Sequence, residues 1–261
     1  MHTGTETTAR ERGWLLAEKY GGVETPEFLE DIKRLAVGEP LAYLIGHIPF
    51  LDATIFLDSR PFIPRPETEC WVTRAIEEMR AYTSKKRGES LSVLDLCAGS
   101  GCIGVSVLKA VPDARIDFAE INARHHGTIL KNLLANDIDP ARARIFSGDL
   151  FAEIAKVETR YDFILANPPY IDPNRINRVQ KSVIAHEPSQ ALFGGADGME
   201  YISRILKEAP RYLAQSNVLY IEHEPEHTAR IHTLAQSLYA SRETYADQWQ
   251  INRYTRLARA K

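Results

Sequence analysis

The sequence predicts an α/β fold in which helices cover both faces of a doubly wound, mostly parallel sheet. Five short apolar runs alternate with helical stretches from residue 92 onward, which is typical of such sheets. Two further strand-like runs near the C-terminus are joined by only a few residues, so we expect them to form an antiparallel hairpin. The expected strands are residues 93–97, 115–121, 143–148, 161–166, 217–221, 243–247 and 254–258.

Helices are expected between these strands, where apolar side chains recur with helical spacing. Another helix is expected before the first strand, with Thr68 as its N-cap and Trp71, Val72 and Met79 on its inner face. The helices that we expect between the strands are residues 101–110, 123–136, 198–209 and 226–239.

The N-terminal part is expected to be a reduced helical region. Thr25-Pro26 is a typical helix start, and a shorter helix is expected near Trp14. The short β-like runs that follow predict a small hairpin. We therefore divide the chain into a helical N-terminal region at 1–37, a linker with a β-hairpin at 38–66 and the main α/β domain at 67–261.

Composition and charge exclude some classes of function. A formal net charge of −3 gives no overall bias toward nucleic acid, so no stable nucleic-acid partner is expected, although a nucleic-acid substrate stays open. No run of about 18 apolar residues is present, and the N-terminus lacks the apolar core of a signal peptide. Three cysteines fit a reducing compartment. We expect a cytoplasmic protein, not membrane-bound, that acts as a monomer.

The most informative stretch is Asn167-Pro168-Pro169-Tyr170, which follows a buried strand. Two prolines remove two backbone donors and restrict φ to about −65°, so the chain leaves the strand stiffly. The Asn167 side-chain oxygen and the Pro168 carbonyl offer two acceptors, and Tyr170 offers an aromatic face. This arrangement suits a planar group that carries an NH2, because both hydrogens can be accepted.

A glycine-rich turn follows the first strand of the sheet and predicts a nucleotide-like ligand. Glycines let the backbone approach a ligand closely, and the next helix offers free N–H groups. Residues 99–104 also match G-x-G-x-x-G, with Glu120 where a ribose-binding acid is expected; alone, this would suggest NAD. The candidate ligand-binding residues of this turn are Asp95, Cys97, Ala98, Gly99, Ser100 and Gly101.

Two acids favour S-adenosylmethionine over NAD. Asp95 can accept from an ammonium group, which this cofactor has and a pyrophosphate lacks. Asp149 can accept from the adenine amine while Leu150 packs on the ring, and Glu120 can accept from the ribose hydroxyls. Four strands end at these acids and at Asn167, namely at Asp95, Glu120, Asp149 and Asn167, so we expect these side chains at one edge of the sheet.

Three further stretches, residues 38–46, 62–69 and 187–198, give the chain a family resemblance. Together with the glycine turn and Asn167-Pro168-Pro169-Tyr170, they resemble the peptide chain release factor glutamine N5-methyltransferases, known as PrmC or HemK. The resemblance implies a class I methyltransferase with a seven-stranded sheet, using S-adenosylmethionine. It implies methylation of the glutamine of the Gly-Gly-Gln motif in class I release factors. Asn167 and Pro168 would hold the glutamine amide, with Pro169 and Tyr170 beside it.

Several alternatives stay open. The family's N-terminal domain is a bundle of several helices, and only a short region precedes residue 38 here. Residues 222–227 also depart from the family's Gly-Tyr-Asp-Gln-Gly-like segment. The alternatives are methylation of a ribosomal-protein glutamine or of DNA adenine-N6, an NAD-dependent dehydrogenase, and a protein that binds the cofactor without catalysis.

One motif has the pattern of a metal site, but its surroundings indicate a strand end followed by the start of a helix instead. Residues 223–227 match the zinc-protease pattern H-E-x-x-H, which needs both histidines on one face of a continuous helix. A strand is expected to run into His223, and Pro225 interrupts any helix before His227. We therefore expect no metal, and we expect His125 and His126 to lie on an exposed helix surface.

Overall fold

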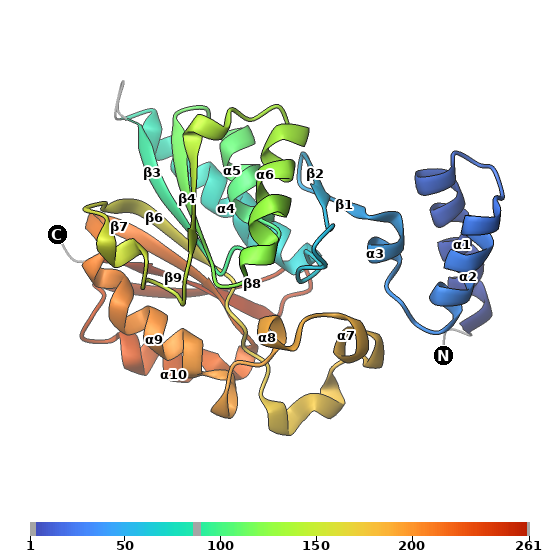
Figure 1. The fold of residues 1–261 in the computed structure, drawn as a ribbon. Helices are drawn as coiled ribbons and strands as arrows, with labels where there is room; N and C mark the ends of the chain where they lie inside the picture. Colours follow the sequence, from blue (N-terminus) through green and yellow to red (C-terminus); the bar gives the residue numbers. More distant parts are fainter. Residues whose placement is uncertain (1–3, 86–89, 260–261) are drawn as a thin grey trace.

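A seven-stranded sheet with the order β5-β4-β3-β6-β7-β9-β8 forms the centre of the computed structural model, which describes residues 4–85 and 90–259 (Figure 1). The first five strands in this order are parallel to their neighbours, and β9 is antiparallel to β7 and β8. This topology confirms the predicted doubly wound sheet and C-terminal hairpin. The strands are β3 (Leu91–Leu96), β4 (Ala114–Glu120), β5 (Ala143–Ser147), β6 (Tyr161–Ala166), β7 (Leu213–Glu222), β8 (Ser241–Ala246) and β9 (Asn252–Ala258).

Each face of the sheet has its own hydrophobic core, because successive strand residues point to opposite faces. Val93 belongs to one core and Leu94 to the other. The first core includes side chains of α4 (Pro66–Thr83), α5 (Cys102–Ala110) and α6 (His126–Ala135). The second includes α9 (Glu200–Glu208) and α10 (Thr228–Ala235).

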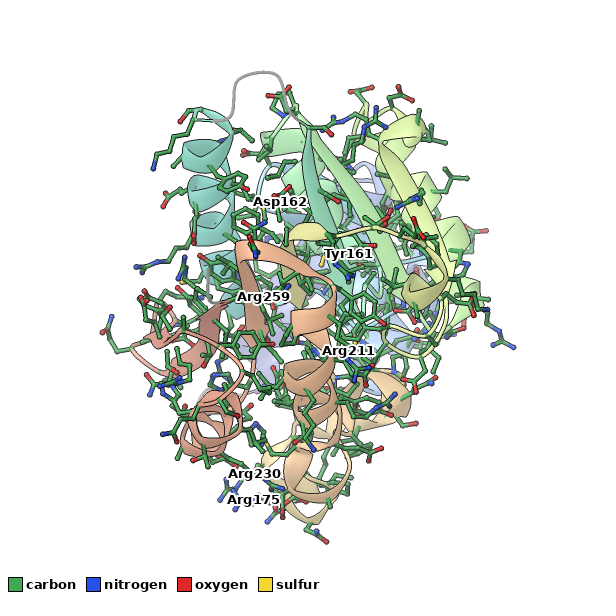
Figure 2. All side chains as sticks on the ribbon, turned by 90° about the vertical axis from the view of Figure 1, so that its left-hand side faces the viewer. Tyr161, Asp162, Arg175, Arg211, Arg230 and Arg259 are labelled. Carbon is green, nitrogen blue, oxygen red and sulfur yellow. The ribbon has the colours of Figure 1, made fainter. Side chains whose placement is uncertain are left out.

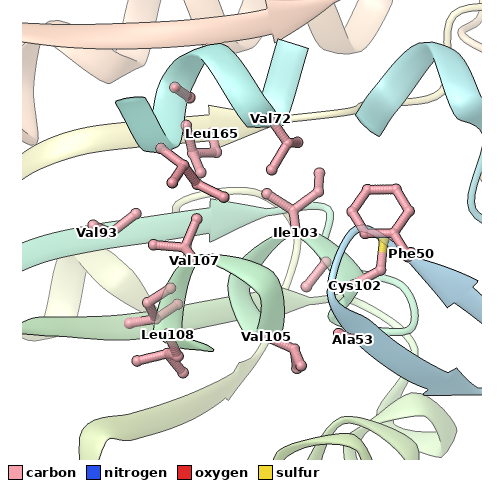
Figure 3. Packing of buried hydrophobic residues seen from close by; sticks show 14 of the residues in the cluster. Phe50, Ala53, Val72, Val93, Cys102, Ile103, Val105, Val107, Leu108 and Leu165 are labelled. Atoms are coloured by element: carbon pink, nitrogen blue, oxygen red, sulfur yellow. The ribbon is translucent and has the colours of Figure 1, made fainter. Parts of the chain in front are cut away.

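A small hairpin of β1 (His47–Phe50) and β2 (Ala53–Phe56) completes the first core. Figure 3 shows Phe50 of this hairpin beside Cys102 of α5. Asn132 of α6 accepts a hydrogen bond from the Phe56 N–H at 2.7 Å, which fixes the hairpin edge on the helix. The hairpin therefore packs as part of the main body.

The N-terminal helices form a separate, smaller cluster. They are α1 (Gly4–Tyr20), α2 (Pro26–Ala36) and α3 (Leu41–Ile45). The Thr25 side chain accepts from the Phe28 N–H at 3.2 Å and so caps α2 at the predicted helix start. Leu44 of α3 packs with this cluster, so the helical unit continues past residue 37 in its packing. Figure 1 shows α1 and α2 standing apart from the sheet.

Two local expectations are wrong. The helix near Trp14 is 17 residues long, whereas we expected a short one. Thr68 does not cap α4, because the helix begins at Pro66 and Arg65 precedes it. Proline is favoured in the first helical turn, where no partner for its missing N–H is needed. Thr68 is consequently free to bond elsewhere.

The long segment after β6 consists of short helical pieces between turns. In Figure 2, Tyr161 and Asp162 mark the start of β6 in the upper half of the view, and Arg175 lies at the bottom. The pieces in this segment are η4 (Pro173–Arg178), α7 (Lys181–His186), α8 (Ser189–Leu192) and η5 (Ala196–Gly198). Other 3-10 turns are η1 (Ala123–His125), η2 (Pro140–Arg142), η3 (Ile154–Lys156), η6 (Ala209–Arg211) and η7 (Pro225–His227). None of the described helices is long and apolar enough to cross a membrane.

Candidate active site

A cavity lies at the carboxyl ends of the parallel strands, where the order of the sheet reverses between β3 and β6. The turns after four successive strands line it together, as the sequence predicts. Asp95 and Gly101 are not among its lining residues. The predicted site residues that line the cavity are Cys97, Ala98, Gly99, Ser100, Glu120, Asp149, Leu150, Asn167, Pro168, Pro169 and Tyr170.

The glycine turn is shaped by left-handed backbone and by Glu120. Gly99 has φ 55° and Gly101 has φ 77°, values that residues with a side chain rarely adopt. One oxygen of the buried Glu120 carboxylate accepts the Gly99 N–H at 2.7 Å, and the other accepts the Asn122 N–H at 2.8 Å. Glu120 thus holds the turn after β3 against the end of β4.

Asp95 lies beneath the glycine turn. Its Oδ2 accepts the Gly104 N–H at 2.8 Å, while its buried Oδ1 has no hydrogen-bond partner among the described residues. Burial raises the pKa of Asp95 to about 8, since a charge is costly away from water. In this position Asp95 anchors the start of α5, and a direct contact with a cofactor stays a prediction.

The acid after β5 is paired within the protein. Asp149 accepts from the Arg204 guanidinium of α9 at 2.7 Å. Leu150 is buried, and its backbone is left-handed at φ 50°. The ion pair fixes Asp149 at the wall of the cavity, where its carboxylate retains further acceptor sites.

The tetrapeptide after β6 is held by side chains and by a glycine-rich loop. The Asn167 Nδ2 donates to Thr68 Oγ1 at 3.3 Å, and the Tyr170 hydroxyl donates to Glu222 at 2.9 Å. Gly194 lies so close that an added Cβ would be 2.6 Å from the Pro169 carbonyl oxygen. The loop at 194–198 therefore requires glycine in order to pack on this backbone.

Residues from two segments of the cavity wall were not predicted to belong to the site. Phe62 and Pro64 come from the loop before α4, and Gln190 comes from α8. The buried Glu187 joins the two loops, because it accepts the Ile63 N–H at 3.0 Å and forms an ion pair with Arg65. These residues lie in the stretches that carried the family resemblance, but nothing in their spacing indicated that they meet.

Neither His125 nor His126 lies on the expected exposed helix surface, since His126 is half-buried and its Nε2 bonds the Glu120 carbonyl at 3.3 Å. His125 is 5% exposed, lines the cavity and bonds Ser59 Oγ at 2.8 Å through Nδ1, so the expected exposed position is wrong. Burial lowers its pKa. His223 bonds the Glu224 carbonyl and Thr255, and His227 lies in the 3-10 turn η7 and bonds the Asp197 carbonyl. Across the described ranges, no group of three or more potential metal ligands gathers.

Comparison with known proteins places the chain in a family. Residues 80–197 match the family model described as "Methyltransferase small domain". The release factor glutamine methyltransferase of Bifidobacterium longum is 30% identical, over 94% of this chain and 85% of its own length. The enzyme of the same name from Rhodopirellula baltica is 32% identical, over 80% of this chain and 69% of its own length.

Solved structures share the fold. A methyltransferase from Pyrococcus furiosus has a TM-score of 0.55 at 14% identity, covering 88% of this chain and 98% of its own. A 16S rRNA methyltransferase from T. thermophilus, solved with AdoMet and guanosine, has a TM-score of 0.54 at 17% identity, covering 82% of this chain and 50% of its own. This chain belongs to the release factor glutamine methyltransferase family and is a class I, S-adenosylmethionine-dependent methyltransferase.

Proposed function

We propose that this protein methylates the side-chain amide nitrogen of a protein glutamine, the Gln of the Gly-Gly-Gln motif in class I peptide chain release factors. The observation that carries the proposal is the cavity that Asn167-Pro168-Pro169-Tyr170 shares with the glycine turn. The names of the relatives support the substrate.

The cavity residues fit S-adenosylmethionine, which supplies an electrophilic methyl group when bound. A carboxylate has about four lone-pair sites, and within the described part of the chain Glu120 uses two of them on backbone N–H groups. Two sites are left for the two ribose hydroxyls. Asp149 and Leu150 at the cavity wall suit the adenine amine and ring, and residues 97–100 provide the close backbone.

The chemistry requires positioning, because an amide nitrogen is a weak nucleophile whose lone pair is delocalised into its carbonyl. Asn167 Oδ1 and the Pro168 carbonyl would accept the two amide hydrogens and hold the nitrogen in line with the methyl carbon. Positioning of this kind can lower a barrier by about 7 kcal/mol. The bound cofactor would supply the methyl group as its carbon–sulfur bond breaks. Asn167 Oδ1 and the Pro168 carbonyl would keep the amide hydrogens in place until one of them leaves the methylated nitrogen as a proton to solvent.

Methyl transfer from labelled S-adenosylmethionine to a purified class I release factor tests the proposal. A second release factor, in which the Gly-Gly-Gln glutamine is alanine, is the control. Label on the first and none on the second supports both the reaction and the substrate. Label on neither, with cofactor binding intact, refutes the release factor as substrate.

The same assay separates the remaining alternatives when its first result is negative. Ribosomal protein and adenine-containing DNA are then offered as acceptors, and label on either identifies the acceptor. No transfer to any acceptor, with the cofactor bound, identifies a binding protein. Action as a cytoplasmic monomer stays a prediction, and the mass of the purified chain in solution tests the monomer.

A further inference from the structure

A buried carboxylate lies behind the tetrapeptide. Glu222, the last residue of β7, is 1% exposed and is not one of the cavity-lining residues. Its Oε2 accepts from the Thr68 hydroxyl and from the Trp71 indole N–H, each at 2.7 Å. Its Oε1 accepts from the Tyr170 hydroxyl at 2.9 Å. One side chain thus connects α4, β7 and the segment after β6.

The donors determine the direction of these hydrogen bonds. An indole N–H can only donate, and an ionised carboxylate can only accept, so Glu222 suits all three donors in its charged form. Burial raises the pKa of Glu222, and the three hydrogen bonds and nearby Arg253 oppose this effect by stabilising the charge. The carboxylate therefore receives the only hydroxyl hydrogen of Thr68.

The direction of the hydrogen bond from Thr68 to Glu222 determines how Thr68 bonds Asn167. With its hydrogen donated to Glu222, the Thr68 oxygen is left as an acceptor, and Asn167 Nδ2 donates to it at 3.3 Å. The carboxamide of Asn167 has one NH2 side and one oxygen side. When its NH2 side faces Thr68, its oxygen is the group left for a ligand.

We propose that Glu222 and Thr68 are positioning residues that set the orientation of the Asn167 carboxamide, so that its oxygen accepts from the amide of the substrate. The inference rests on the proposed function in that the substrate offers an N–H. In the reversed orientation, the NH2 of Asn167 would face the NH2 of the substrate amide, and no hydrogen bond could form between them. The same orientation disfavours glutamate in place of glutamine, because a carboxylate offers no hydrogen to Oδ1.

The test compares Thr68→Val, which removes the hydroxyl at similar size, with Thr68→Ser, which keeps it. Thr73→Val is the matched control on α4, because the Thr73 hydroxyl is exposed and, among the described residues, donates to the Glu69 carbonyl alone. For each variant, kcat and KM on the release factor are measured together with the affinity for S-adenosylmethionine. Side-chain amide signals of Asn167, assigned by their loss in Asn167→Asp, report its hydrogen bond in 15N-labelled protein.

We expect Thr68→Val to lower kcat at least about tenfold, since a 1 Å misplacement near the chemistry can cost about 100-fold. Cofactor affinity should change less than about twofold, as for an interaction made only in the transition state. Thr68→Ser should restore most of kcat, and among the Thr68 and Thr73 variants only Thr68→Val should shift the Asn167 amide signals. Thr73→Val should match the wild type in all readouts.

Glu222→Leu provides an independent test at a residue outside the cavity. It removes both acceptor oxygens at similar size, so the Thr68 hydroxyl loses the acceptor that fixes its direction, kcat should fall and the Asn167 signals should shift. If this variant fails to fold, the Thr68 variants still decide the matter. Wild-type kcat and unchanged Asn167 signals in Thr68→Val would overturn the inference and leave the proposed function intact. If the wild type itself does not methylate the release factor, the proposed function fails, and the Asn167 signals alone decide the inference.

Discussion

Replacement of Gly194 by alanine should disturb catalysis from outside the cavity. A Cβ at this position would lie 2.6 Å from the Pro169 carbonyl oxygen and 2.7 Å from Tyr170 Cα. Because real Cβ contacts are longer than about 3.0 Å, one of these backbones must move by roughly 0.5 Å. We expect kcat to fall about tenfold to 100-fold, since such shifts near the reacting atoms are costly. Overpacking should destabilise the fold by about 1–3 kcal/mol.

Gly127→Ala is the matched control, because no described atom outside its own helical turn lies within 4 Å of the added Cβ and the residue is in α6. It should leave kcat unchanged and stabilise the helix by about 0.5–1 kcal/mol. Steady-state kinetics, cofactor titration and urea unfolding of both variants make the comparison. Wild-type kcat in Gly194→Ala, or a loss of cofactor affinity in proportion to kcat, would contradict this role of Gly194.

Three further outcomes follow from the site. Asn167→Ala should lower kcat at least about 100-fold with a modest change in cofactor affinity, and equal losses in kinetics and calorimetric titration would contradict its role. Glu120→Ala should weaken cofactor binding about tenfold to 100-fold, because hydrogen bonds to charged groups contribute about 1.5–3 kcal/mol; unchanged affinity in the same titration would exclude the contact. Burial raises the pKa of Asp95 in the folded state from its ordinary 3.8 to about 8. Protonated Asp95 therefore contributes fully to the free energy of unfolding below pH 3.8, and this contribution is lost as the pH rises through about 8. Urea unfolding between pH 6 and 8 should show wild-type stability falling by about 1 kcal/mol per pH unit relative to Asp95→Asn, and parallel curves would rule this out.

Local chemistry alone determined several elements. The apolar run and the following prolines define the strand Tyr161–Ala166, which the structure confirms at both ends. Thr25 and Pro26 define the start of α2 for an equally local reason, a side-chain cap before a residue that needs no N–H partner. The alternation of strands and helices along the chain was also sufficient to predict the parallel sheet, because parallel strands need crossover connections, which are usually helices. The carboxyl-end position of Glu120 and Asn167 followed from this topology.

Only the tertiary structure decided which distant side chains meet. Thr68 has the local pattern of an N-cap, yet it bonds Glu222, 154 positions away, because Pro66 already starts the helix. His125 has the pattern of a helix surface but is covered by the loop that carries Ser59. Gly194 is required by the backbone of Pro169, which no local signal reveals. Such contacts depend on how the packed layers align, and periodicity along the chain fixes the face of an element but not its neighbour across the core.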